Sequence, residues 1–265
     1  MRLLAAALRK LARRPASWVV ALILLAILAL FYLALGASAN QIPDERQRAQ
    51  IETFLRDETA VRVLLGFLLG LGGLLALAYA GAVGGAEWTW GTLRVVVARG
   101  ESRSRYVLTT FAAIAIVVLL GLIVAFAVGL ALLLLASAMA GVPAPSLSGE
   151  FLAGLPGLVG LAWLGLVEQA AIGFGVATVA RSQLAGVGAG IALYVLEQFV
   201  SVALPQQSRY LPFTVSSSLV ATPEQAATVG TQLLDPALSL GLTAAYLVLA
   251  LGIAALVTET AEITG

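Results

Sequence analysis

Six apolar runs, each as long as a membrane-spanning helix, constrain this chain more than any other feature. A helix rises 1.5 Å per residue, so a hydrocarbon core about 30 Å thick needs about 20 apolar residues to cross it. The predicted spans are residues 17–36, 61–84, 105–136, 157–180, 184–203 and 236–257. With 60% hydrophobic and 11% charged residues, a water-soluble domain of this length could not bury its apolar surface. The sequence therefore predicts an all-α, polytopic membrane protein with a single transmembrane domain over residues 1–265.

Residue types that are absent exclude several classes of function. The chain has no Cys and no His, which excludes thiol and imidazole metal sites, His-ligated haem and nucleophile–base pairs built on His. Lys10 is the only Lys, so there is no glycine-rich phosphate loop followed by a Lys. We therefore expect no catalytic, cofactor-binding or metal site here, and expect ATP and Mg to be bound by a partner subunit if they are used. A net charge of +1 gives no reason to expect nucleic acid.

Residues 1–14 combine apolar and basic side chains at helical spacing. One face carries Leu3, Leu4, Ala7, Leu8 and Leu11, and five basic residues occupy the remainder. This pattern predicts a helix lying in the membrane interface, with its basic side against anionic lipid head groups. Pro15 can end that helix, and Trp18 can anchor the next span at the interface.

A cleaved signal peptide is the alternative for this region, with residues 37–39 as its cleavage site. However, the apolar run exceeds the 7–15 residues typical of a signal core. Five more spans follow and need an orienting first helix, so we favour an uncleaved span.

The basic residues predict the orientation in the cell (inner, cytoplasmic) membrane. They concentrate in the N-terminal segment, in residues 85–104 and at Arg181, whereas Arg209 is the only basic residue in 137–156 and 204–235. Basic loops face the cytoplasm, so six spans place both termini there. Residues 37–60 carry nearly balanced charges, and we favour a solvated connector over a surface amphipathic helix.

Three pairs of small residues occur at four-residue spacing in the apolar runs: Gly66/Gly70, Gly81/Gly85 and Gly186/Gly190. Such pairs allow helices to approach closely in lipid.

The loop 85–104 contains the residues that are most suited to a functional contact. We expect a short helix starting near Glu87, a break at Gly91, a second helix over 92–98 ended by Gly100, and Ser102 as the cap of span three. Trp88, Trp90 and the apolar residues 95–97 exceed what a simple connector needs, and they suit docking of another protein. Anchoring of Trp and Arg at the membrane interface explains them equally well.

The sequence Glu87-Trp88-x-x-Gly91-Thr92-Leu93-Arg94, followed by Arg99-Gly100-x-Ser102-Arg103, resembles the first cytoplasmic loop of the exporter-type (type-2) permease subunits of ATP-binding-cassette (ABC) transporters. The basic N-terminal helix is similar to the elbow helix of that family, and residues 210–213 resemble its outer segment between spans five and six. The resemblance implies six spans, pairing with a second permease subunit, and docking on an ABC ATP-binding subunit. It places Glu87, Trp88, Trp90, Gly91, Thr92 and Arg94 in the docking loop.

Glu168 and Glu197 lie within predicted spans four and five, Glu168 near the midplane. A carboxylate at the centre of a bilayer costs a few kcal/mol, so neither should face lipid. They either form a substrate or proton path, or are hydrogen-bonded to a neighbouring helix or partner subunit. We favour the second interpretation, because no basic partner is evident in the spans.

The leading hypothesis is therefore a permease subunit of an ABC transporter. The family that it resembles consists of exporters, and we expect the chain to have no enzymatic activity of its own. The alternatives are a membrane enzyme acting on lipid, disfavoured because the predicted cytoplasmic acidic residues are scattered, and a stand-alone membrane anchor or immunity-type protein without an ATPase partner.

Overall fold

The structure is a computed structural model that describes residues 2–39, 52, 54–98, 100–222 and 233–261; these residues form helices joined by turns and irregular segments, and include no strand. Six of the described helices are long and apolar enough to cross a membrane. They are α2 (Pro15–Ser38), α4 (Asp57–Thr89), α6 (Arg103–Ala140), α7 (Gly149–Ala180), α8 (Gln183–Ala203) and α12 (Pro236–Thr260). The all-α class and the six predicted spans are thus confirmed, and the architecture is that of a multi-pass membrane protein.

Each predicted span lies inside one of these helices, and the helices extend beyond the apolar runs. A helix continues until a cap or a glycine ends it, whatever the polarity of its last turns. Ser102 caps the start of α6 by accepting a hydrogen bond from Arg105 N, and Gly141, with φ of 69°, ends it. The predicted connector 37–60 lies mostly outside the described residues.

Four shorter helices complete the described chain: α1 (Arg2–Ala12), α5 (Thr92–Ala98), α9 (Pro205–Ser208) and α10 (Pro212–Ser218). Helix α1 coincides with the predicted N-terminal helix, and Pro15 is the first residue of α2. Two side chains of α2 satisfy carbonyls at the end of α1. Ser17 Oγ donates to Leu11 O (2.7 Å), and Trp18 Nε1 donates to Ala12 O (2.9 Å).

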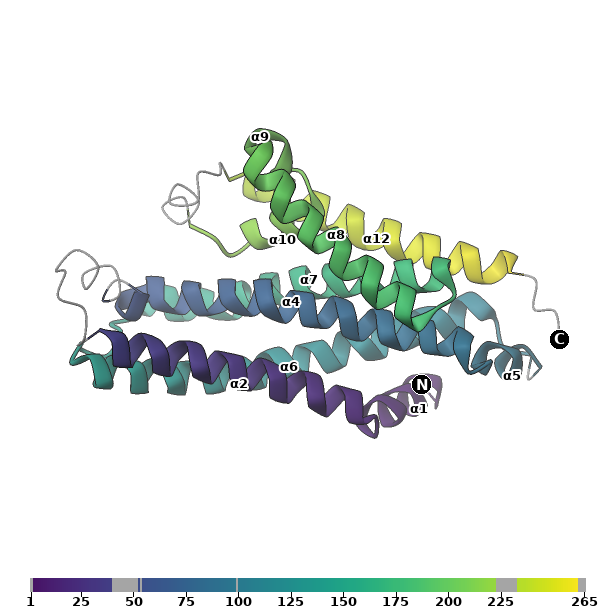
Figure 1. The fold of residues 1–265 in the computed structure, drawn as a ribbon, viewed down its shortest axis with the longest axis horizontal. Helices are drawn as coiled ribbons and strands as arrows, with labels where there is room; N and C mark the ends of the chain where they lie inside the picture. Colours follow the sequence, from purple (N-terminus) through teal and green to yellow (C-terminus); the bar gives the residue numbers. More distant parts are fainter. Residues whose placement is uncertain (1, 40–51, 53, 99, 223–232, 262–265) are drawn as a thin grey trace.

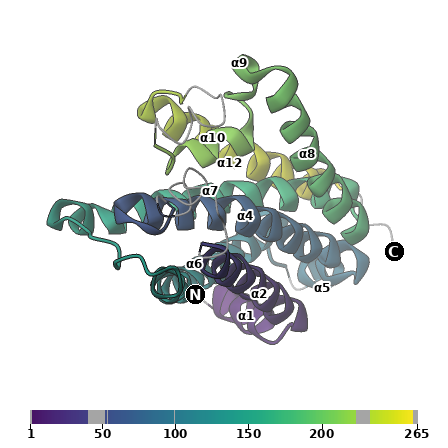
Figure 2. The same ribbon diagram turned by 60° about the vertical axis from the view of Figure 1, so that its left-hand side comes forward.

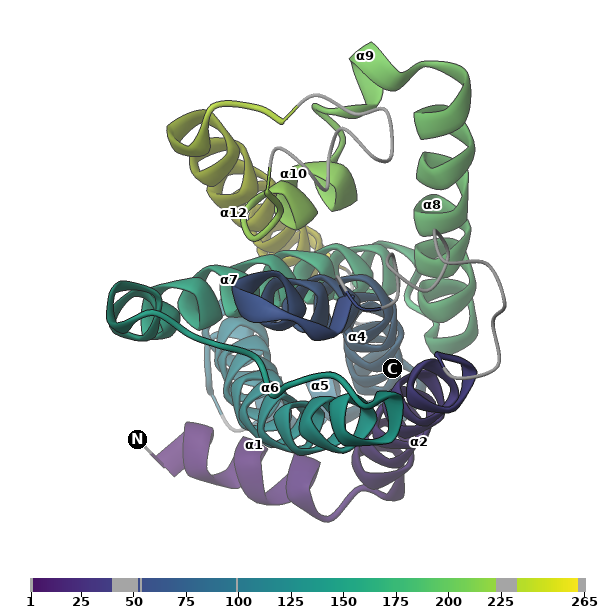
Figure 3. The ribbon, with the colours of Figure 1, turned by 90° about the vertical axis from the view of Figure 1, so that its left-hand side faces the viewer.

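The long helices form three layers (Figure 1). Helices α4 and α7 make the middle layer and contact each other most extensively, α2 and α6 pack on one side, and α8 and α12 on the other. The view along the bundle in Figure 3 shows α8 diverging from α12, with α10 between them. The turned view in Figure 2 shows α1 beside the start of α2, against the α2–α6 side.

Glycines permit the close approach of the middle layer to its neighbours. A Cβ atom at Gly173 would lie 2.2 Å from Leu77 O on α4, and one at Gly85 would lie 2.3 Å from Gln183 Cα on α8. Among the predicted small-residue pairs, Gly81/Gly85 and Gly186/Gly190 lie at such close contacts. The pair Gly66/Gly70 does not: a Cβ at Gly66 would meet open space, and one at Gly70 would lie 3.9 Å from Tyr194 OH on α8.

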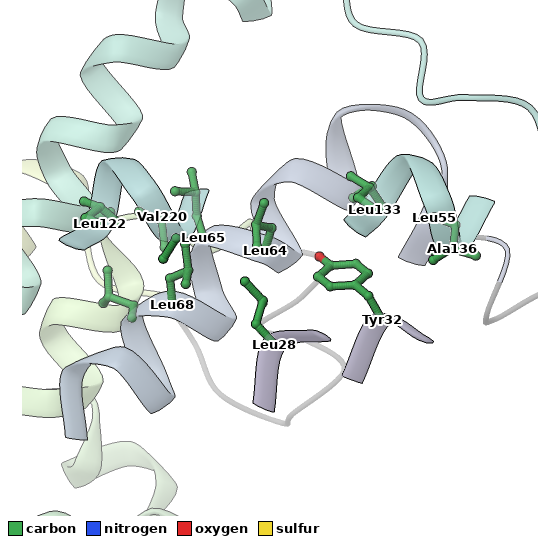
Figure 4. Close-up of a cluster of buried hydrophobic side chains, with 14 of the residues drawn as sticks. Leu28, Tyr32, Leu55, Leu64, Leu65, Leu68, Leu122, Leu133, Ala136 and Val220 are labelled. Carbon is green, nitrogen blue, oxygen red and sulfur yellow. The ribbon is translucent and has the colours of Figure 1, made fainter. Parts of the chain in front are cut away.

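The core contains two apolar clusters. Figure 4 shows part of one, in which Leu28 and Tyr32 of α2 meet Leu64 and Leu68 of α4 and Leu133 of α6. The second cluster gathers side chains of α1, α4, α6, α7 and α12, and includes Leu11, Tyr79, Phe111 and Phe174. Large apolar side chains also cover the outer faces, among them Leu22 of α2, Phe199 of α8 and Val248 of α12. These faces suit contact with lipid rather than water.

The two ends of the bundle differ in what they carry. Helices α1 and α5, the α7–α8 turn and the last turn of α12 lie at one end, named the α1–α5 end here (Figure 1). The starts of α4, α7 and α12, together with α9 and α10, lie at the other, the α9–α10 end. Helix α1 and the last turn of α12 therefore lie at the same end, as an even number of crossings requires.

Candidate functional site

Glu87 belongs to the end of α4 rather than to the start of a separate helix. The prediction of a short helix beginning near Glu87 is wrong, because α4 continues through Thr89 without a break. Trp90 N still donates to Ala86 O (3.0 Å), which continues the helical pattern into the turn. The carboxylate therefore lies near the C-terminal end of a helix, where the backbone dipole disfavours a negative charge.

Side chains from two other helices compensate that carboxylate. Lys10 Nζ of α1 lies 2.6 Å from Glu87 Oε1, and Tyr106 OH of α6 donates to Glu87 Oε2 (2.8 Å). The Glu87 side chain is 4% exposed and that of Lys10 is 34% exposed. Glu87 therefore joins α1, α4 and α6 and does not present its carboxylate to a partner.

The remainder of the predicted loop has the expected backbone. Gly91, with φ of 64°, separates α4 from α5, and Gly100, with φ of 75°, follows α5. A left-handed backbone favours glycine, since other residues meet steric strain there. Helix α5 occupies the predicted range 92–98, and Ser102 caps α6 as expected. These local features are confirmed.

The two tryptophans differ in exposure. Trp90 is 61% exposed and has the guanidinium of Arg14 4.8 Å from its ring centroid, whereas Trp88 is half-buried under Arg181 at 5.1 Å. Val95 on α5 is also mainly exposed. Trp90 and Val95 are thus two exposed apolar side chains at the α1–α5 end, one before and one after Gly91; we name them together the α5 surface.

Thr92 and Arg94 complete the predicted loop residues. Thr92 is half-buried and, with Lys10, Glu87 and Tyr106, lines a cavity of about 330 Å³ beneath α1. Arg94 lies in α5, and its side chain is outside what the structure describes, as is Arg99.

The start of α6 also binds the end of the last span. Arg103 Nη1 donates to Ala261 O (2.7 Å) and Glu259 O (3.3 Å), and Ser104 N donates to Glu259 Oε1 (3.1 Å). The segment that follows α5 is thereby attached both to α12 and, through Tyr106, to α4 and α1. Sequence reasoning missed these partners, since they lie about 155 residues apart along the chain.

Glu168 lies in the middle of α7 and is fully buried, with neither carboxylate oxygen hydrogen-bonded within the described residues. Ser216 of α10 interacts with Glu168, but its hydroxyl is placed to donate to Phe213 O (3.2 Å) and to accept from Gln169 Nε2 (3.1 Å). The predicted burial is confirmed, and among the described residues no hydrogen bond joins the Glu168 carboxyl group to a neighbouring helix.

Glu197 has a defined partner. Its carboxylate accepts hydrogen bonds from Phe213 N (3.1 Å), Thr214 N and Thr214 Oγ1 (2.7 Å) at the start of α10. Free N–H groups at a helix start stabilise negative charge. Glu197 therefore fastens α10 to α8, in agreement with the favoured interpretation of a carboxyl bonded to a neighbouring helix.

The described residues contain no group of three or more Asp, Glu, His or Cys side chains that could hold a metal ion. No family model matches the chain, and no curated protein is similar to it in sequence.

Proposed function

We propose that this chain is the permease subunit of an ABC transporter. The resemblance of its loop indicates a permease of the exporter type. It would lie in the cell membrane with the α1–α5 end in the cytoplasm, pair with a second permease subunit, and move an unidentified substrate. A separate ABC subunit would bind and hydrolyse ATP with Mg. The observation that supports the proposal best is the α5 surface, since an exposed Trp at a glycine break offers an anchor for a partner protein.

The connections of the α5 surface suit mechanical coupling. Helix α5 follows α4 after one short turn, and Glu87 at that turn bonds to α1 and α6. Movement of a docked partner would therefore displace the ends of several helices together. Rigid-body movement of packed helices is an established way to switch between two arrangements.

The test is purification of the tagged chain from its native host in mild detergent, with mass spectrometry of the proteins that accompany it. Trp90→Ala and Val95→Ser remove exposed apolar contacts and leave the Lys10–Glu87–Tyr106 contacts in place. We expect an ABC ATPase in near-equal amount with the unchanged chain, reduced about tenfold or more by the double substitution, as for loss of an interface anchor.

Val179→Ser provides the matched control, because Val179 is an exposed apolar residue (53%) at the end of α7 and lies outside α5 and the adjoining turn. It should retain the ATPase. Recovery of a folded, unchanged chain without any ATPase would contradict the proposal and favour the stand-alone membrane protein.

A further inference from the structure

A second polar site lies at the opposite end of the bundle. A cavity of about 360 Å³ opens between α4, α7, α8 and α10, where α8 diverges from the middle layer. Its volume is within the range of about 300–1,000 Å³ that is usual for small-molecule sites. Neither the α5 surface nor the Glu87 contacts take part in it.

The charge of the lining is positive. Arg62 of α4 and Arg209, which follows α9, are the charged side chains that line the cavity, and no acidic side chain of the described residues does so. Glu197 is close in sequence to the lining residue Gln198, but its oxygens already accept the hydrogen bonds from α10. The cavity therefore favours an anion.

Both guanidinium groups lie over aromatic rings, and each has N–H donors that bond to no acceptor among the described residues. Arg62 lies 5.6 Å from the ring centroid of Phe151, and Arg209 lies 4.8 Å from that of Tyr210. Arg209 donates from Nη2 to Tyr210 OH (2.8 Å), whereas its Nε is buried and has no acceptor in the described structure. Leaving a buried donor unsatisfied is costly, so an acceptor that enters the cavity gains a ready partner.

The positions of the two arginines indicate phosphate as the chemical group that the cavity binds. Arg62 is five residues from the start of α4, about 7.5 Å along the helix axis, and Arg209 lies in the connection beyond α8. Both therefore belong to the region between hydrocarbon and water, where lipid phosphates lie. Paired arginines match the geometry and charge of phosphate oxygens.

We propose that this cavity binds a phosphate ester through Arg62 and Arg209, with the ester at the α9–α10 end. The ester belongs either to a phospholipid head group or to a water-soluble phosphate. Binding at this site does not depend on an ATPase partner, so the proposal stands apart from the proposed function.

The experiment is native mass spectrometry of the full chain in detergent, titrated separately with 1-palmitoyl-2-oleoyl-phosphatidylglycerol and with glycerol 1-phosphate. We expect one ligand molecule to bind more tightly than any further molecules. The double substitution Arg62→Gln/Arg209→Gln should weaken the binding of that first molecule about tenfold or more, since charge-assisted hydrogen bonds to both arginines are lost. Saturation by the lipid alone would identify a head-group site, and saturation by both ligands would identify a site for the phosphate ester itself.

Two further variants separate the site from general charge and from misfolding. Arg56→Gln removes an exposed arginine at the same end that does not line the cavity, and binding should remain unchanged. Gly66→Leu keeps both arginines and adds a side chain where a Cβ meets open space beside the cavity, so it should block binding without loss of thermal stability. Equal binding of both ligands by the unchanged chain, the double arginine variant and Gly66→Leu would overturn the proposal.

Discussion

Lys10 Nζ lies 2.6 Å from Glu87 Oε1, and this ion pair joins the N-terminal helix to the end of the second spanning helix. Because Tyr106 donates to the other carboxylate oxygen, three helices meet at one side chain. The contact explains how an amphipathic helix that could lie free in the interface is instead fixed against the bundle. Through these contacts Glu87 positions the turn between α4 and α5.

Lys10→Met and Glu87→Gln are each expected to lower the free energy of unfolding by about 1–3 kcal/mol, because each leaves a largely buried charged or polar partner unsatisfied. The free energy of unfolding of the double variant should fall by less than the sum of the two single effects, since both members of the ion pair are then removed together. Unfolding in mixed detergent micelles measures these differences. Arg9→Met, at an exposed position of the same helix, is the control and should change stability little. Simple additivity of the two substitutions would contradict the pairing.

Gly173→Ala is expected to destabilise the protein by about 1–3 kcal/mol or more, because the new methyl group would overlap the Leu77 carbonyl and separate α7 from α4. Gly66→Ala is the matched control, since its methyl group meets open space. It should be neutral or stabilising by up to about 1 kcal/mol, from the higher helix propensity of Ala. Size-exclusion chromatography after heating measures the ratio of folded to aggregated protein, and this ratio should differ between the two glycine variants. Equal tolerance of both substitutions would contradict the close packing.

Glu197→Ala should loosen α10, because the N–H groups of Phe213 and Thr214 lose their acceptor. We expect a loss of about 2–4 kcal/mol for several charge-assisted hydrogen bonds, together with faster amide hydrogen exchange in residues 212–218. Glu150→Ala removes an exposed carboxylate at the start of α7 and should change neither quantity. Unchanged exchange in α10 after Glu197→Ala would show that other contacts position that helix.

Glu168→Leu should stabilise the protein, by about 1–3 kcal/mol, since it removes a buried carboxyl group without a hydrogen-bond partner. Gln169→Leu, at the next residue, should have the opposite effect because Gln169 Nε2 donates to Ser216 Oγ. Comparison of the two by thermal unfolding tests this contrast, and a destabilised Glu168→Leu variant would refute it.

A stable Glu168→Gln variant that no longer transports would assign the carboxyl group to the substrate or proton path, whereas unchanged transport would exclude that role.

Arg103→Gln should release the last turn of α12, because Arg103 donates to the carbonyls of Glu259 and Ala261. Carboxypeptidase digestion of the intact protein in detergent is expected to proceed several-fold faster at residues 259–261. Arg105→Gln is the control, since Arg105 is exposed and its side chain does not bond to α12. Equal digestion of both variants would contradict a specific role for Arg103.

The amino-acid sequence determined the six helices and the main local features of the 85–104 segment. Apolar run length, the left-handed glycines Gly91 and Gly100, and the Ser102 cap act within a few residues, so they can be read without knowledge of the fold. The N-terminal helix was predictable for the same reason. The extent of α4 was not, because the helix continues through Glu87 and Thr89 past the end of its apolar run.

Only the tertiary structure decided which polar groups meet. Lys10 and Glu87 are 77 positions apart, and their contact depends on how α1 folds back against α4 and α6. Likewise, the same four-residue glycine spacing gives close packing at Gly81/Gly85 and open space at Gly66, because α8 lies near α4 at one end of the bundle and diverges at the other. Helix formation depends on neighbouring residues, whereas burial, pairing and cavities depend on the paths of helices that are distant in sequence.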